Sequence, residues 1–231
     1  MRYDLHAHSK YSPDSVLEPE RIVKTAIKRG LSGIAVTDHD TIKGGLKAKK
    51  YETEDFAVIV GSEIKTARGE IIGLFLEEEV KPAAGDFQEL VSAIKRQNGI
   101  VVIPHPFDEL RRSALHPTEE DAKFVDCIEC FNSRCIFQRY NDRAVEFAAK
   151  HRLPVTAGSD AHFANEIGNA GIITEAGITE TEAGITEAGA VEEVREALRK
   201  NEVQTFGRRS SLVNHIGSKV VRIWKKAVRF D

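Results

Sequence analysis

The sequence predicts an α/β fold in which parallel strands alternate with helices, and three observations support it. Short runs rich in branched apolar residues alternate with segments of helical spacing. Strand, helix and strand in alternation implies parallel pairing with right-handed crossovers. These two observations fit an open doubly wound sheet or a closed barrel. The third, polar side chains that follow the strands, favours a barrel, because barrels gather functional side chains at the carboxyl ends of their strands.

Seven strands and the helices between them follow from the spacing of apolar residues. The predicted strands are Arg2–Leu5, Gly33–Val36, Ala57–Val60, Ile71–Leu76, Ile100–Ile103, Asp126–Phe131 and Leu153–Thr156. Helices are predicted where apolar residues recur at intervals of three or four. Such residues are Ile22, Ala26 and Ile27 before Gly30, Leu90, Val91 and Ile94 before Gly99, and Ala144, Val145 and Ala148.

Residues 173–189 contain a short repeat, ITEAG, then ITETEAG, then ITEAG. Its period is far below the ~20–50 residues of solenoid repeats, so we interpret it as an expanded surface loop or as a repetitive end of a strand and start of a helix. Glu182 and Glu187 are expected to be solvated. Val191, Val194, Ala197 and Leu198 then recur at helical spacing and predict a helix.

The chain from Gly207 onward is strongly basic. It carries Arg208, Arg209, Lys219, Arg222, Lys225, Lys226 and Arg229 against one acidic residue, Asp231. Apolar residues at helical spacing, from Val213 to Ala227, predict a helix whose apolar stripe docks on the body while its cations face solvent. The alternative is that Arg208, Arg209 or Lys219 reaches the mouth of an active site and holds an anionic substrate.

Length and composition favour one globular domain with appendages. The chain has 231 residues, of which 41% are hydrophobic and 30% charged, so it is not wholly disordered. A net charge of −3 gives no general attraction to nucleic acid or anionic membranes, so any polyanion site must be local. No apolar run approaches the ~18 residues of a membrane span. Without a secretory signal either, we expect a cytoplasmic protein with no membrane partner.

The remaining cysteines and histidines receive structural interpretations. Three cysteines argue against a disulfide framework. Cys127 and Cys130 have C-x-x-C spacing but no second pair, so we assign them to the barrel wall rather than to a zinc or redox site. His116, His151 and His215 are expected at the surface or at helix ends.

The strongest local motif is His6-Ala7-His8 in the first strand. Residues i and i+2 of a strand point to the same side, so two imidazoles can bind one divalent cation there. The second strand ends in Asp38-His39-Asp40, where Asp40 could instead cap the following helix.

Three more motifs stand at strand ends. Glu63 follows the third strand, and a carboxylate can bridge two cations. His105 lies between two prolines, whose fixed φ stiffens the loop that presents it. Asp160 and His162 follow the last strand. Each motif alone is weak, but five at successive strand ends predict a shared metal site.

Taken in order, DLHAHS, TDHD, GSE, IPHP, IECFNSR and AGSDAH resemble the motifs of the polymerase and histidinol phosphatase (PHP) family of metal-dependent phosphoesterases. The resemblance implies a distorted (β/α)7 barrel over residues 1–170, similar to a TIM barrel, with a metal cluster at the carboxyl ends of its strands. It implies a PHP-associated segment over residues 171–231, which holds the repeat and the basic helix. It also implies two or three zinc, manganese or iron ions.

The resemblance further implies three ligand sets. The first metal would take His6, His8, Glu63 and Asp160; the second would share Glu63 and use His105; the third would take Asp14, His39 and His162. Many members have a histidine on the fourth strand where this chain offers Glu70. A carboxylate can still ligate, and it would favour manganese, iron or magnesium over zinc. The alternative is an exposed Glu70 that opens an edge strand.

Such a cluster predicts a phosphoric ester hydrolase, because cations acidify a water and clamp phosphoryl oxygens. The expected substrates are small phosphorylated metabolites or nucleotides, including nucleoside bisphosphates and the ends of short oligonucleotides, which would make it a nuclease. Arg134 could grip a terminal phosphate or lie at the surface, and His162, a neighbouring acid or water would protonate the leaving group. The rival functions are an amidohydrolase and a non-catalytic PHP scaffold. The oligomeric state is left open.

Overall fold

A computed structural model describes residues 1–81, 86–175 and 187–228 of the chain. In this part the strands form a single sheet in the order β7-β6-β5-β4-β3-β2-β1-β8-β9. The segment that follows β7, at one end of this order, lies beside β1, where the His8 amide donates to the Ala161 carbonyl at 2.8 Å and the Asp160 amide donates to the His6 carbonyl at 2.8 Å. The sheet is therefore a nearly closed barrel, which confirms the predicted fold class. The strands are β1 (Arg2–Ala7), β2 (Gly33–Val36), β3 (Ala57–Lys65), β4 (Glu70–Leu74), β5 (Ile100–Ile103), β6 (Cys127–Asn132), β7 (Val155–Gly158), β8 (Ala170–Thr174) and β9 (Val203–Gly207).

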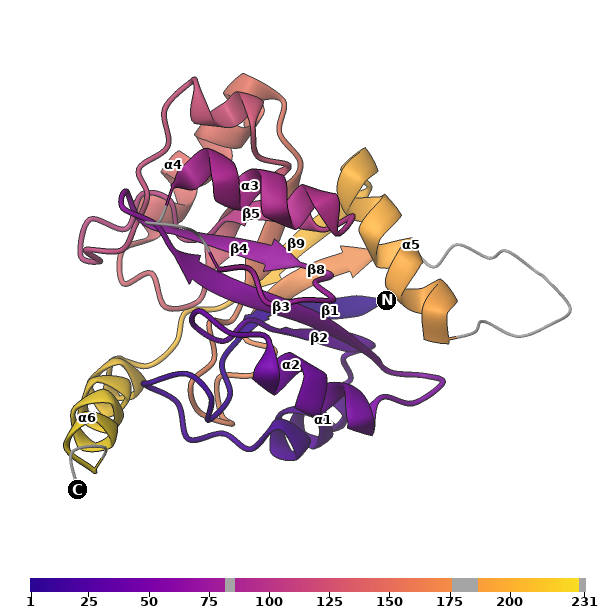
Figure 1. Cartoon of the computed structure of the whole chain (residues 1–231), viewed down its shortest axis with the longest axis vertical. Coiled ribbons are helices and arrows are strands. Elements are labelled where there is room, and N and C mark those ends of the chain that lie inside the picture. Colours follow the sequence, from indigo (N-terminus) through magenta and orange to yellow (C-terminus); the bar gives the residue numbers. More distant parts are fainter. Residues whose placement is uncertain (82–85, 176–186, 229–231) are drawn as a thin grey trace, which may run out of the picture.

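Helices cover the sheet on opposite sides (Figure 1). α1 and α2 lie on one side, α3 and α4 lie on the other, and α6 lies at the periphery. Three apolar clusters fix the barrel: one beneath α3 and α4, one beneath α1, and one that Val194 and Leu198 of α5 complete. The helices are α1 (Pro19–Lys28), α2 (Lys43–Ala48), α3 (Phe87–Arg96), α4 (Gln138–His151), α5 (Glu187–Lys200) and α6 (Leu212–Val228), with short 3-10 turns at Lys49–Tyr51 and Asp121–Lys123.

The fourth strand departs from the predicted parallel pairing. β4 is antiparallel to both β3 and β5. A parallel connection needs about a dozen residues or more, whereas only residues 66–69 join β3 to β4. The Thr66 amide donates to the Gly69 carbonyl at 2.7 Å and closes this turn. The antiparallel direction brings the first residue of β4, Glu70, to the rim where the parallel strands end.

β8 and β9 extend the sheet beyond the seven predicted strands. β8 pairs antiparallel with β1, and β9 pairs antiparallel with β8. Residues 176–186 of the repeat lie outside the described part of the chain, as do the side chains of Glu182 and Glu187. The division of the chain at residue 170 stays a prediction.

The predicted orientation of α6 is wrong. Its apolar side chains face solvent: Val213 is 73% exposed, Ile216 65% and Ile223 71%. The reason is that the surface beneath the helix is polar and needs hydrogen-bond partners. The Arg134 guanidinium donates to the Asn214 carbonyl at 3.0 Å and to the Ser218 hydroxyl at 2.7 Å, so the polar face of α6 is the docked face.

Several smaller expectations can be compared with the structure. Cys127, Cys130 and Cys135 are buried free thiols. Asp40 does not cap α2, because its carboxylate accepts the Lys65 amide at 2.9 Å instead. In the described residues no helix is long and apolar enough to cross a membrane.

Candidate metal centre

The nine predicted ligands lie together at one rim of the barrel. Each comes from the end of a strand or from a loop that follows one: His6 and His8 from β1, Asp14 from the loop after it, His39 after β2, Glu63 in β3, Glu70 at the start of β4, His105 after β5, and Asp160 and His162 after β7. All except His39 are buried, and His39 is partly buried. Glu70 is 8% exposed and its strand is flanked on both sides, so the exposed edge-strand alternative is wrong.

The Glu63 carboxylate is the centre of the cluster. Its Oε1 lies 2.9 Å from His105 Nε2. Its Oε2 lies 3.1 Å from His39 Nδ1, 3.4 Å from His8 Nε2 and 3.6 Å from His6 Nε2. One carboxylate therefore meets four imidazoles that come from the ends of three strands, β1, β2 and β5, which is the geometry that a bridging ligand needs.

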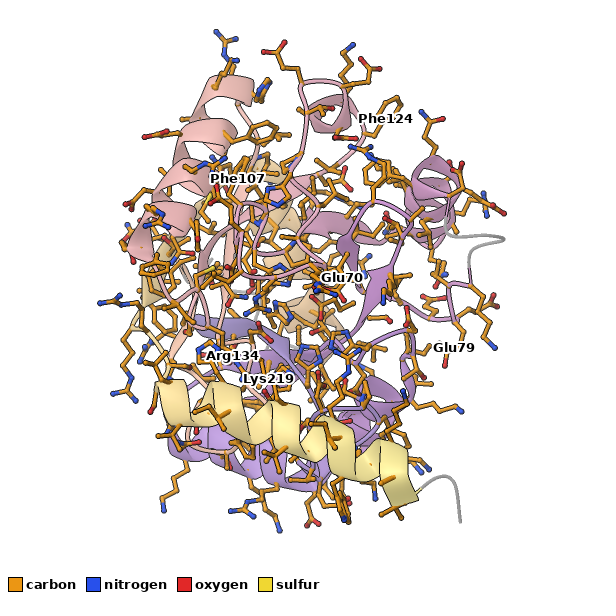
Figure 2. All side chains as sticks on the ribbon, turned by 90° about the vertical axis from the view of Figure 1, so that its left-hand side faces the viewer. Glu70, Glu79, Phe107, Phe124, Arg134 and Lys219 are labelled. Atoms are coloured by element: carbon orange, nitrogen blue, oxygen red, sulfur yellow. The ribbon has the colours of Figure 1, made fainter. Side chains whose placement is uncertain are left out.

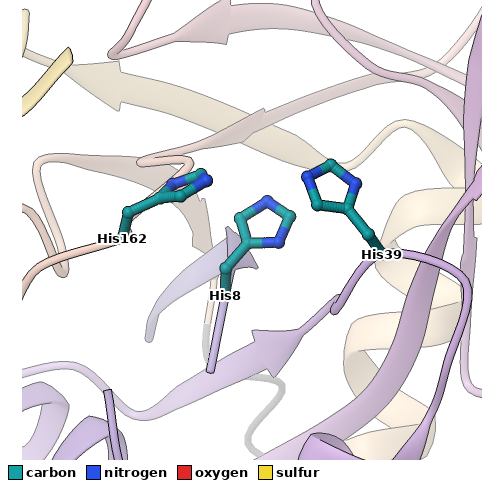
Figure 3. Close-up of side chains that lie close together, drawn as sticks. All are labelled: His8, His39 and His162. Atoms are coloured by element: carbon teal, nitrogen blue, oxygen red, sulfur yellow. The ribbon is translucent and has the colours of Figure 1, made fainter. Parts of the chain in front are cut away.

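Three histidines line the outer part of the cluster (Figure 3). The His8 ring lies between His39 and His162, with centroids at 4.6 and 4.4 Å. Asp14 joins the two outer rings, since its carboxylate oxygens lie 3.5 Å from His39 Nε2 and 3.3 Å from His162 Nε2. Possible ligand atoms of His8, His39 and His162 lie within 4.8 Å of one another, as do those of His6, His8 and Asp160.

Hydrogen bonds outside the cluster fix which ring nitrogens face it. Glu129 Oε1 lies 2.9 Å from His6 Nδ1, and the Ser12 hydroxyl lies 3.0 Å from His8 Nδ1. Ser12 in turn donates to Asp38 at 2.9 Å. These partners favour a proton on Nδ1, so the Nε2 lone pairs of both imidazoles point into the cluster, as ligating histidines require.

Two of the candidate ligands have strained backbone conformations. His105 and Asp160 have φ values of 31° and 53°, in the left-handed region. The His105 amide donates to Glu129 at 2.8 Å, which helps to hold that conformation. Strain of this kind persists only where the surrounding structure over-determines the backbone, and it concentrates at functional sites.

The surroundings keep two of the central donors, His8 and Glu63, in their deprotonated forms. Burial and the nearby His162 lower the pKa of His8 to about 3. Burial opposes ionisation of Glu63, but His6 and His39 outweigh it and hold the pKa of this carboxyl well below its usual range. Burial and Glu63 raise the pKa of Glu70. Neutral imidazole and carboxylate are the forms that bind a metal ion.

This donor set fits divalent cations. Lone pairs of imidazoles and carboxylates converge here, with few hydrogen-bond donors between them. This convergence of acceptors costs free energy unless a cation binds between them. Asp14 Oδ1 is buried and has no hydrogen-bond partner among the described residues. Mixed imidazole and carboxylate ligands suit zinc, iron and manganese.

Comparisons with known proteins agree with this geometry. Residues 138–203 match a family model described as PHP-associated. The protein MJ1587 of Methanocaldococcus jannaschii is 43% identical over 144 residues, which are 58% of this chain and 82% of that protein. A two-domain Bacteroides vulgatus protein described as containing a PHP-like metal-dependent phosphoesterase superposes with a TM-score of 0.71 at 18% identity, over 90% of this chain and 65% of that one. The chain belongs to the PHP family.

Two further likenesses cover a smaller share of this PHP protein than the Bacteroides vulgatus structure does. A 5'-3' exoribonuclease from Haemophilus influenzae is 42% identical over 78 residues, which are 32% of this chain and 28% of that enzyme. A structure described as an amidohydrolase from Chromobacterium violaceum superposes with a TM-score of 0.55 at 18% identity, over 70% of this chain and 88% of that one. At this identity the structural likeness concerns the fold.

Sequence reasoning missed the roles of Glu129, Ser12 and Asp38, which support this PHP cluster from outside. The Glu129 carboxylate accepts a hydrogen bond from His6 Nδ1 on one oxygen and from the His105 amide on the other. The motif IECFNSR contained Glu129, and its acidic side chain in an apolar strand was a signal that could have been used. Ser12 and Asp38 also lie inside or beside recognised motifs.

Arg111 was missed as well, and no local motif marks it. Its Nη1 lies 2.7 Å from Asp160 Oδ2, and its Nε lies 3.0 Å from Asp108. Burial works against ionisation of Asp160, but Arg111 and His6 hold the pKa of this carboxyl well below its usual range. Arg111 therefore keeps Asp160 ionised and oriented toward His8.

Arg134 lies beside the cluster rather than within it. It is 4% exposed, and its Nε lies 3.8 Å from Glu166. Glu166 accepts the His162 amide at 3.0 Å, so Arg134 is connected to the loop that carries His162. Its Nη2 is engaged by α6. A role for Arg134 in phosphate binding stays a prediction.

His215 gives a prediction about pH. Burial, Arg134 and Arg111 lower the pKa of this α6 histidine to about 4, from an ordinary value of 6.5. Between pH 4 and 6.5 the unfolded chain binds more protons at His215 than the folded chain does. His215 therefore makes the free energy of unfolding rise with pH across this window, and this contribution is lost as pH falls. Urea unfolding between pH 4.5 and 7 should therefore show a shallower pH dependence in His215→Gln than in the wild type. The exposed His116→Gln is the control, and an unchanged slope in His215→Gln would contradict the assignment.

Proposed function

We propose that the chain is a metal-dependent phosphoesterase that hydrolyses a phosphate ester of a small metabolite or nucleotide. The observation that carries the proposal is the Glu63 carboxylate, which lies within 3.6 Å of imidazole nitrogens from His6, His8, His39 and His105. Family membership supports the same chemistry. The partial likeness to an exoribonuclease supports nucleotides as substrates, including nucleoside bisphosphates and oligonucleotide ends.

The cofactors in this proposal are two or three divalent cations. When bound, they would acidify a water and neutralise charge on the phosphoryl oxygens. His6, His8, Glu63 and Asp160 would hold the first cation, and Glu63, Glu70 and His105 the second. Asp14, His39 and His162 would hold the third. The number of carboxylates favours manganese or iron over zinc.

The chain's own residues perform the remaining tasks. Arg111 neutralises the charge of Asp160 through Oδ2. The other carboxylate oxygen, Oδ1, faces His8 and lies 3.3 Å from its Nε2. His162 donates through Nδ1 to the Asp160 carbonyl at 2.8 Å, which leaves its Nε2 as the ligand for a third cation. In a site with two cations, the same Nε2 would instead receive a proton and pass it to a leaving oxygen. Arg134 and His215 border this region and supply cationic or polar groups for a second phosphate.

A substrate screen on metal-stripped and metal-loaded protein tests this function. We expect hydrolysis of an aryl phosphate and of nucleoside bisphosphates with manganese, and none after chelation. Hydrolysis of amides or lactones without phosphatase activity would instead identify an amidohydrolase. A scaffold would show no turnover with any metal.

The amidohydrolase alternative has one specific weakness. Such sites commonly contain a bridging lysine, whereas no lysine is buried in the described residues. Asp14 and His162 additionally form a third group of donors beyond the first two. We therefore retain phosphate esters as the substrate class. A cytoplasmic location is retained as part of the proposal.

Arg134 and Arg111 should differ in their effects on catalysis. Arg134→Ala should raise KM for a bisphosphate more than for a monophosphate, if its guanidinium binds the second phosphate. Arg111→Gln should lower kcat for both substrates, by about tenfold or more, because Asp160 loses its partner. Steady-state kinetics on both substrates checks this. Equal changes in KM on the two substrates would remove Arg134 from substrate binding.

A further inference from the structure

The outward face of α6 is a continuous apolar strip. It consists of residues at helical spacing along one side of the helix. Their exposed fractions are far above those of a docked face: Leu212 59%, Val213 73%, Ile216 65%, Val220 59%, Ile223 71%, Trp224 56% and Val228 55%. An exposed apolar area of this extent on one element marks an interaction surface.

The helix cannot simply turn this strip inward, because its opposite face is held by specific hydrogen bonds. Arg134 binds the carbonyl of Asn214 and the hydroxyl of Ser218. Farther along the helix, Lys225 Nζ donates to the carbonyls of Lys10, Ser12 and Ser15 at 2.6 to 2.7 Å. Turning the helix would leave these polar groups without partners at a high free-energy cost. The strip is therefore presented to a partner outside the chain.

A basic strip runs beside the apolar one. Lys219, Arg222 and Lys226 follow one another at spacings of three and four residues, and all three are exposed. Residues 208–228 contain no acidic residue, although the whole chain has a net charge of −3. The positive charge is therefore local to this helix. A partner for α6 must offer an apolar layer next to an anionic one.

We propose that α6 is an interfacial helix that docks the protein on an anionic lipid bilayer. In such a helix the apolar face enters the boundary between headgroups and acyl chains while the flanking cations meet anionic headgroups. Trp224 and the aliphatic residues supply the apolar face, and Lys219, Arg222 and Lys226 supply the cations. Figure 2 shows α6 lying across the outside of the molecule, where a flat surface can reach it.

Two other partners, a second copy of the chain and a nucleic acid, each fit only one of the two strips. A second copy of the chain, paired through the same helix, would cover the apolar strip but would leave both basic strips without an anionic partner, since residues 208–228 contain no acidic residue. A nucleic acid would neutralise the cations but would leave the aliphatic side chains in water, since its recognition depends on phosphates and stacked bases. A bilayer with anionic lipids satisfies both.

The experiment uses Trp224, the one tryptophan of the chain, as an internal probe. The full chain is mixed with vesicles of phosphatidylcholine alone or with added phosphatidylglycerol, and sedimentation and tryptophan emission are measured. We expect binding to the anionic vesicles with a shift of emission to shorter wavelength, and weaker binding as salt rises. Vesicles of phosphatidylcholine alone should bind far less.

Two variants separate the contributions of the strips. Val220→Asp combined with Ile223→Asp should abolish binding and the spectral shift, because charge enters the apolar face. The triple variant with Lys219→Gln, Arg222→Gln and Lys226→Gln should bind about 100-fold more weakly. The reason is that each cation near an anionic surface adds a comparable amount to the binding free energy. Val145→Asp, which changes an exposed apolar residue of α4, should bind like the wild type. Hydrolysis of an aryl phosphate by the apolar-strip variant should stay unchanged, so failed folding is distinguishable from failed docking.

Three results would overturn the proposal. The first is no binding to anionic vesicles. The second is a dimer in solution that the Val220→Asp and Ile223→Asp changes dissociate, which would assign the strip to a second copy. The third is a tryptophan shift with a short oligonucleotide but none with vesicles, which would assign α6 to nucleic acid. Each result is independent of the proposed hydrolysis.

Discussion

Glu63→Gln should reduce hydrolysis of an aryl phosphate by at least about 1000-fold, because the metal-assisted chemistry is worth several kcal/mol and each 1.36 kcal/mol is a factor of ten. The change keeps the size of the side chain and removes its charge. Glu63 Oε1 and Oε2 face His105 and His39 at 2.9 and 3.1 Å, so a neutral amide would weaken more than one cation position together.

The control for this change is Glu146→Gln, at an exposed position of α4. It should hydrolyse the aryl phosphate at the wild-type rate. Circular dichroism and thermal unfolding without metal should be close to wild type for Glu63→Gln, because this variant also relieves repulsion between Glu63 and Glu70. More than about a tenth of the wild-type activity in Glu63→Gln would contradict a bridging role.

Removing the cations should destabilise the protein strongly. A ligand present at about 1000 times its Kd stabilises the folded state by about 4 kcal/mol. In a chain of this length each kcal/mol moves Tm by about 2–4 °C, so chelation should lower Tm by about 10 °C. Added manganese should restore both Tm and activity. Differential scanning calorimetry with and without a chelator measures this directly.

Acid should weaken the same stabilisation. Burial opposes a proton on His6, but Glu129 and Asp160 outweigh it and raise the pKa of His6 well above its usual value when no cation is bound. A cation must displace that proton, so its apparent affinity should fall as pH falls. A Tm that does not change with chelator at any pH would favour the scaffold alternative.

The location of the site could be predicted from the sequence because parallel strands put their carboxyl ends at one rim. His6, His39, His105 and Asp160 each lie at or just past the end of a predicted strand, so their convergence required only the α/β pattern. Glu70 is different, since it opens a strand instead of ending one. It reaches the same rim only because β4 runs antiparallel. The signal for that direction was the stretch 61–70 between the two predicted strands, which is too short for a parallel crossover.

The orientation of α6 and the role of Arg111 could not be predicted in this way. A 3.6-residue period shows that a helix has an apolar face but not which surface that face meets. The polar surface around Arg134, which decides the orientation, forms only after distant segments assemble. Arg111 comes from a loop without a motif, and its contact with Asp160 depends on the same assembly.

The metal content of the purified protein decides whether these side chains form a metal centre. Purified protein, loaded with manganese or zinc and freed of excess metal, should contain two or three ions per chain by elemental analysis. Anomalous diffraction at the metal edge should place them among His6, His8, His39, Glu63, His105 and Asp160. Glu63→Gln should lose at least one ion. A chain that retains no stoichiometric metal, with these side chains bonded only to one another, would contradict the account.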